Sequence, residues 1–172
     1  MSVSAGIKCV FEDDSGIKLR GFGGLFDITG DSNYEGVDLE YFAATIQLGV
    51  DQSYLAGGFS GDFEAGKIAG GAFFGTSCNS DPLLIADPQF GEVLGPADQF
   101  SGGYLYFEVW APLYDFSCVF RLKAGIGLGL GYFVEGPTYV GKLKLGAEGE
   151  ALCVVTIRGE AVLIGVKRGD EF

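Results

Sequence analysis

The stretch from Gly141 to Val166 reads GKLKLGAEGEALCVVTIRGEAVLIGV, and it alternates between apolar and polar positions. Its odd-numbered positions are mostly apolar or small, and the even-numbered positions from Lys142 to Glu150 carry lysine, glutamate or glycine. A period of two places successive side chains on opposite faces of a β-strand. The pattern predicts antiparallel strands with the apolar face buried and the charged face in solvent. Because the stretch exceeds a usual strand, we expect a turn near Gly146–Glu150 or Arg158–Glu160.

The same alternation recurs along the chain, and the 30 glycines leave few windows suited to a helix. The alternation changes phase at Tyr41-Phe42, which a β-bulge would explain; a short amphipathic helix over this segment is the alternative. We predict that Tyr54–Phe63 and Ile68–Phe74 form a hairpin that is closed by Glu64–Lys67. Strands are predicted at Ile7–Glu12, Ile17–Thr29, Val37–Val50, Tyr54–Phe63, Ile68–Phe74, Tyr104–Pro112 and Ser117–Phe133.

The 172 residues suit a single domain spanning 1–172. We predict an all-β domain of about eight to ten antiparallel strands, closed or nearly closed as a barrel, with a two-sheet β-sandwich as the alternative. One long irregular loop at about 76–101 holds three of the five prolines. Loops of this length tend to be functional or to cover part of the domain.

The run Gly125–Gly131 superficially suggests a dinucleotide-binding loop. Such a loop needs a strand-to-helix turn, whereas here the alternation continues on both sides and no helix follows. We therefore interpret the run as a strand with one bare face, on which aromatic side chains from a neighbouring strand pack. No cofactor is expected.

Charge and composition narrow the possible chemistry. The chain has 23 acidic and 11 basic residues, a net charge of −12 and no histidine. Repulsion from phosphate argues against nucleic acid and makes anionic membrane surfaces an unfavoured partner. The missing histidine excludes His-based triads and histidine metal ligands. The acidic segment Asp27–Asn33 matches no EF-hand spacing, and we expect no metal there.

Seven residues are candidate ligand or partner contacts. Basic residues spaced two apart lie on one face of a strand, and three such pairs would form a cationic strip if their strands were neighbours. Cross-strand pairing with the surplus carboxylates is the favoured alternative. Trp110 lies in a strongly apolar segment, where core packing is the favoured role and a partner contact the alternative. The candidates are Lys18, Arg20, Arg121, Lys123, Lys142, Lys144 and Trp110.

The four cysteines, Cys9, Cys78, Cys118 and Cys153, are far apart in sequence. They form no C-x-x-C motif, so they are either small buried residues or members of one or two disulfides whose pairing is open. No secretory signal pattern is present, and Met1 is the only methionine. On this basis an extracellular setting or an excised fragment is favoured over a cytoplasmic one.

Three function classes remain open. The first is a non-enzymatic structural or protein-interaction module, part of a larger protein or a homo-assembly. The second is a barrel that binds a small apolar ligand, including one that catalyses a reaction through the shape of its cavity. The third and least favoured is an outer-membrane β-barrel, against which the cysteines and the charged last strand argue.

Overall fold

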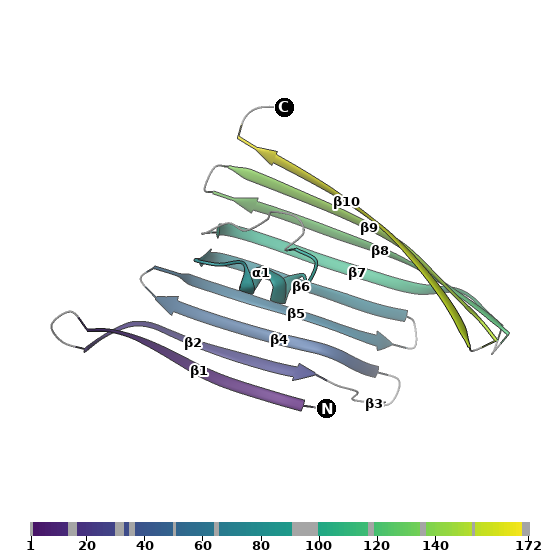
Figure 1. Cartoon of the computed structure of the whole chain (residues 1–172), viewed down its shortest axis with the longest axis horizontal. Helices are drawn as coiled ribbons and strands as arrows, with labels where there is room; N and C mark the ends of the chain where they lie inside the picture. The colour runs from purple at the N-terminus through teal and green to yellow at the C-terminus, as the bar shows by residue number, and fades with distance from the viewer. Residues whose placement is uncertain are drawn as a thin grey trace.

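The computed structural model describes residues 2–13, 17–29, 33–34, 37–49, 51–63, 66–90, 100–116, 119–134, 137–152 and 154–169, with side chains from residue 38 onward. The part of the chain that the structure describes is all-β apart from one short helix (Figure 1). Within the described residues, no helix is long and apolar enough to cross a membrane.

The ten described strands form one antiparallel sheet, in which strands that follow one another along the chain pair, except that β2 pairs with β4 and not with β3. The order is β1-β2-β4-β5-β6-β7-β8-β9-β10, and the two-residue β3 pairs with β4. The strands are β1 (Ser2–Asp13), β2 (Ile17–Thr29), β3 (Asn33–Tyr34), β4 (Val37–Gly49), β5 (Ser53–Phe63), β6 (Gly66–Ser77), β7 (Phe100–Phe116), β8 (Phe120–Phe133), β9 (Thr138–Ala151) and β10 (Val155–Arg168).

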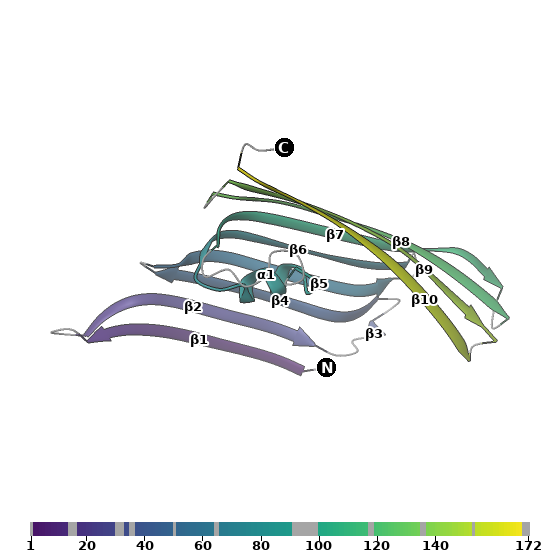
Figure 2. The same ribbon diagram turned by 45° about the horizontal axis from the view of Figure 1, so that its top comes forward.

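The sheet is curved and twisted, with β1 and β10 at its two edges (Figures 1 and 2). The all-β prediction is confirmed. Closure into a barrel is not confirmed, because hydrogen bonds do not join β1 to β10 in the part of the chain that the structure describes. Eight successive antiparallel pairings separate the edge strands, so β1 and β10 run in the same direction.

The predicted bulge in β4 is present, because the register with β5 shifts between Leu39 and Tyr41. The extra residue returns the apolar positions to one face, so the alternative helix is wrong. A turn does interrupt 141–166, as predicted, but neither suggested position is correct, since β9 continues to Ala151 and β10 begins at Val155. Uninterrupted alternation allowed both strands to extend to 14 residues, so the break in the sheet lies between Ala151 and Val155.

The helix α1 (Asp81–Ala86) interrupts the loop predicted at 76–101 and lies against β5 and β6 (Figure 1). Ser80 occupies its N-cap position and Pro82 lies in its first turn, where a proline is tolerated. Two glycines permit the close approach. A Cβ at Gly58 would lie 2.1 Å from the Ile85 carbonyl oxygen, and one at Gly71 would lie 2.1 Å from that of Ala86.

We call the face of the sheet covered by α1 and residues 87–90 the inner face. The hydrophobic core lies between this face and its cover. Leu83, Ala86 and Phe90 pack there against strand residues that include Phe73, Tyr104, Phe100 and Phe133. The expectation that the apolar positions past 141 are buried is therefore wrong. On β9 the buried side chains include Lys142 and Lys144, whereas Leu145 is 46% exposed.

Candidate functional site

Three cross-strand rows on the inner face set the positions of its functional side chains. Each row runs from a large residue of β7, over a glycine of β8, to β9. A Cβ at Gly125 would lie 2.4 Å from the Trp110 ring, and one at Gly129 would lie 2.3 Å from the Tyr104 hydroxyl. The aromatic packing predicted for this glycine run is thus confirmed. In register, the rows are Tyr106–Gly129–Lys142, Glu108–Gly127–Lys144 and Trp110–Gly125–Gly146.

The first charged cluster joins the segment after α1 to the sheet. Lys142 Nζ donates to both carboxylate oxygens of Asp87, at 2.8 and 3.0 Å. Tyr104 Oη also donates to Asp87, at 2.7 Å. The Asp87 and Lys142 side chains are almost completely buried, and Lys142 lies 4.5 Å from the centre of the Tyr106 ring. Because a buried charge without a partner is costly, this pair holds residues 81–90 against the sheet.

The second cluster is centred on the Glu108 carboxylate. Lys144 Nζ lies 2.9 Å from Glu108 Oε1, and the Tyr106 hydroxyl and Trp110 indole N–H donate to the same carboxylate. Lys144 also lies 3.3 Å from Glu160. Arg158 stacks 4.6 Å from the centre of the Trp110 ring. All the charges in this cluster are compensated, so it behaves as a structural network.

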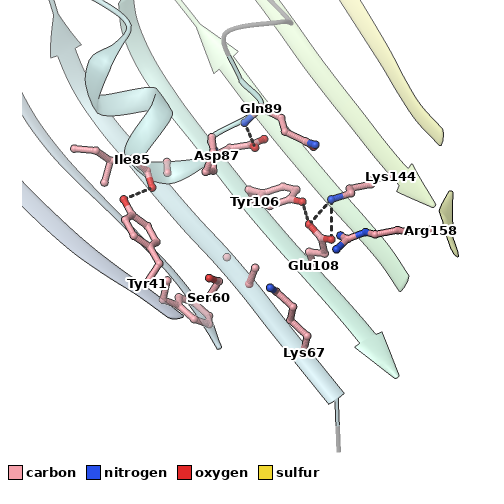
Figure 3. A pocket seen from close by; sticks show the side chains of 15 residues that line it. Tyr41, Ser60, Lys67, Ile85, Asp87, Gln89, Tyr106, Glu108, Lys144 and Arg158 are labelled. Atoms are coloured by element: carbon pink, nitrogen blue, oxygen red, sulfur yellow. Dashed lines mark hydrogen bonds and ion pairs between the residues drawn. The ribbon is translucent and has the colours of Figure 1, made fainter. Parts of the chain in front are cut away.

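A hollow of about 320 Å³ lies between the two clusters and β4–β6 (Figure 3). Tyr41 of β4 and Arg158 of β10 both line it, so the sheet curves toward its inner face. Lys67 and Ser60 donate to Glu40 beside it, and Tyr41 donates weakly to Ile85 at 3.5 Å. Both cations (Lys67, Lys144 and Arg158) and carboxylates (Asp87 and Glu108) line the hollow, together with apolar side chains.

Among the described residues, no group of three or more His, Cys, Asp or Glu side chains is placed so that it could bind a metal ion. The side chains of Asp27–Asn33 lie outside the described set. The space above the β8 glycines is taken by side chains of β7, so those glycines cradle no cofactor.

The structure separates the predicted basic strip. Lys18 and Arg20 lie in β2, which four other strands separate from β8, and their side chains are outside the described set. Arg121 lies 3.3 Å from Asp115 and 3.8 Å from Glu150. Lys123 is in register with Glu148. Together with the buried lysine pairs, these contacts favour cross-strand charge pairing over an open strip.

Trp110 is buried and packs as described above. Cys78 is a free thiol in the structure and is exposed, so it is not one of the small buried residues; the disulfides stay a prediction. The structure describes neither the Cys9 side chain nor residues 118 and 153.

Sequence analysis missed Asp87, Tyr104, Tyr106 and Glu108 as members of the clusters. Asp87 is distant in sequence from Lys142 and is brought to it only by the loop. A usable signal did exist for the others. Once β7 and β8 are paired, each glycine from 125 to 131 stands opposite a large residue of β7.

The opposite face of β4–β10, which we call the apolar face, has no cover among the described residues. Leu128, Leu130, Leu163 and Phe107 are each more than half exposed. By register, Lys167 at the end of β10 is the one charged residue that the described strands β4–β10 place on this face. The other strand charges project from the inner face or lie at a bulge. Further members of the apolar face include Phe42, Ile46, Leu55, Phe59, Phe74, Leu105, Ile126, Leu145 and Ile157.

Aromatic side chains stand at both ends of the apolar face. Tyr132 and Tyr139 pair at one end, with ring centres 4.8 Å apart. Tyr114 and Phe120 pair at the other end, with ring centres 6.2 Å apart. All four are exposed.

Comparison with family models, with curated proteins and with solved structures found no match to this chain.

Proposed function

We propose that this chain is a structural, non-enzymatic wall of a membrane-spanning β-barrel, with lipid against the apolar face and protein or water against the inner face. The observation that carries this proposal is the uncovered apolar face, free of charge along β4–β10 except at Lys167. Membrane strands alternate in this way between lipid-facing apolar residues and polar residues toward the interior. The charged last strand is no longer an obstacle, because Arg158 and Glu160 belong to the inner-face clusters.

The dimensions of the apolar face support a bilayer as its cover. From Phe120 to Tyr132 there are 12 residue steps, or about 41 Å of extended strand at about 3.4 Å per step. At a tilt of about 45°, this spans about 29 Å, close to the roughly 30 Å hydrocarbon core of a bilayer. Aromatic residues favour the interfaces of a bilayer, where the two exposed pairs would then lie.

The total exposed surface is too large for a self-contained globule. The chain exposes 10510 Å², whereas a folded monomer of 18.1 kDa would expose roughly 8,100 Å². Large hydrophobic side chains that are exposed together on one face, as on the apolar face, mark a contact with a partner or with lipid. An apolar cover is therefore required, and the strand length and aromatic ends favour lipid.

Lipid also requires that the edge strands find partners, because hydrocarbon cannot satisfy exposed backbone groups. Closure of the sheet is therefore part of the proposal. Since β1 and β10 run in the same direction, closure within one chain joins them as a parallel pair. Additional strands from a further chain or segment would satisfy the edge strands β1 and β10 equally well.

Quenching of tryptophan fluorescence by brominated lipids tests the proposal. The neighbouring β10 residues Val162 and Leu163 lie on the inner and apolar faces at the same height. We would reconstitute three proteins in vesicles: wild type, Val162→Trp and Leu163→Trp. Bromine on the acyl chains should quench the new tryptophan only in Leu163→Trp. The native Trp110, buried on the inner face, provides an internal reference.

Equal quenching of both new tryptophans, or of neither, would contradict a lipid-facing apolar face. If neither new tryptophan is quenched, light scattering in detergent-free buffer tests whether a second copy of the chain covers the apolar face. A defined dimer would then assign the apolar face to protein.

A further inference from the structure

The edge strand β10 has one open side (Figure 1). It pairs with β9 along all 14 of its residues and without a register shift. No described strand pairs with its other side. The outward row of backbone N–H and C=O groups therefore has no strand partner among the described residues. A row of this kind is a template on which a further strand can pair.

The second half of β10 lacks the features that protect the edge of a sheet. Natural edge strands are short, bulged or interrupted by proline, or they carry charged side chains. β10 has 14 residues and no proline. Its charged residues lie outside the stretch 161–166, which reads AVLIGV. This stretch is therefore suited to pairing with another strand.

Apolar side chains lie on both faces of the stretch 161–166. Leu163 is 64% exposed on the apolar face. Ile164 and Val166 are each 38% exposed on the inner face, in register with Lys142 and Val140 of β9. The helix α1 covers the inner face mainly at β4–β7. A bilayer would cover only the apolar face, so the inner-face side chains of β10 need contacts with protein.

The direction of the two edge strands favours an added strand over direct closure. Every pairing between described strands is antiparallel. Because β1 and β10 run in the same direction, joining them directly would create one parallel pair. Parallel pairs are slightly less stable per residue than antiparallel ones. An odd number of added strands would keep every pairing antiparallel.

We propose that β10 binds an extended strand of a partner polypeptide, antiparallel to β10 along residues 155–168. This rests on the proposed function, because hydrocarbon around the apolar face requires that the backbone of the edge be paired. Hydrogen bonds between the main chains supply the affinity, and alternate side chains supply the specificity.

The two faces of β10 define the side chains of the partner strand. Toward the bilayer they are apolar. Toward the inner face they are uncharged where they meet Val162, Ile164 and Val166. A lysine there would differ from Lys142 and Lys144 of β9, which lie against Asp87 and Glu108. Since those carboxylates are already paired, a further buried lysine would lack compensation.

A synthetic peptide tests this edge on the whole chain in detergent. The peptide copies residues 138–151, the sequence that pairs antiparallel with β10 inside the sheet, and carries Lys142→Thr and Lys144→Thr. Native mass spectrometry should show one bound peptide. At a peptide concentration ten times its Kd, hydrogen–deuterium exchange at the outward amides of β10 should slow about tenfold. Amides of β5 and β6, which have strands on both sides, should not change.

Two further peptides are the matched controls. The unmodified copy of residues 138–151 retains both lysines and should bind about tenfold more weakly, because its charges meet Val162 and Ile164. A third peptide adds Leu143→Pro and Leu145→Pro to the two threonines. It lacks two backbone donors and should not bind.

Slow exchange at the outward amides of β10 before any peptide is added would overturn the proposal, because β1 or a second copy would then already occupy this edge. A dimer in the mass spectrum would identify the second copy. No binding of the threonine peptide, binding that leaves β10 exchange unchanged, or equal binding of the proline peptide would also overturn it. None of these results affects the quenching of Leu163→Trp, so a failed strand partner and a failed membrane wall are distinguishable.

Discussion

The two faces of β9 differ in a way that reverses the usual arrangement of a soluble sheet. Lys142 and Lys144 are 3% and 6% exposed and paired with carboxylates, whereas Leu145 on the opposite face is 46% exposed. In water, this arrangement would leave the larger hydrophobic surface uncovered. The difference teaches that alternation identifies two faces, and that the surroundings decide which of them is covered.

Removing the Asp87 carboxylate should have the largest effect on the inner face. Asp87→Ala leaves Lys142 charged and buried, so we expect a loss of about 3–5 kcal/mol in the free energy of unfolding, measured by urea titration in detergent micelles. The double variant Asp87→Leu, Lys142→Met should lose much less, because no charge is left unpaired. A loss as large in the double variant would show that the loop is held by packing and not by the ion pair.

A charge on the apolar face should lower the free energy of unfolding almost as much, and the size of the loss should depend on the depth of the residue in the bilayer. Leu143→Arg near the middle of the face should destabilise the protein in vesicles by about 2–4 kcal/mol, whereas Tyr139→Arg at the end should cost about 1 kcal/mol or less. Unfolding by urea in lipid vesicles measures both. Similar costs at the two positions would favour a protein cover, for which depth has no meaning.

The glycines of β8, which aromatic side chains of β7 cover, can be compared with Gly141, where a Cβ would meet open space. Gly129→Ala pushes a methyl group toward the Tyr104 hydroxyl and should cost about 1–3 kcal/mol by overpacking. Gly141→Ala enters open space and should be neutral or stabilise by up to about 1 kcal/mol. In a urea titration we expect Gly129→Ala to be destabilising and Gly141→Ala not to be, and a cost of more than about 1 kcal/mol for Gly141→Ala would contradict the open space at this glycine.

The smallest effect is expected at the rim of the inner hollow. The Lys67–Glu40 pair is partly exposed, with side chains 28% and 37% accessible. Lys67→Gln should therefore change the free energy of unfolding by about 1 kcal/mol at most. A larger loss in the same titration would place Lys67 in the buried network.

Much of the sheet was predictable because period-two alternation is a local signal. The strands, the bulge near Tyr41 and the aromatic packing onto the 125–131 glycines all follow from residues close in sequence or from neighbouring strands. The direction of burial did not follow, since a chain alone gives no information about the medium around it. The turn between β9 and β10 was expected but misplaced, because apolar residues such as Leu152 and Val154, both exposed, hide the usual turn chemistry.

The charged clusters could be predicted only in part. The register of β7, β8 and β9 brings Glu108 toward Lys144 across Gly127, and a strand-by-strand alignment would show this. The contact between Asp87 and Lys142 requires the fold of the 78–90 segment over the sheet, which no local pattern encodes.

Depth measurement along β8 tests the membrane-spanning wall most directly. Phe120, Ile126 and Tyr132 share the apolar face and are evenly spaced by six residues, about 20 Å apart along the strand. Each would be replaced singly by tryptophan and examined in vesicles whose lipids carry bromine near the headgroup or near the chain end. We expect chain-end bromine to quench Ile126→Trp most strongly, and headgroup-proximal bromine to quench Phe120→Trp and Tyr132→Trp. One common depth for the three positions, or no quenching at any of them, would contradict a sheet that crosses the bilayer.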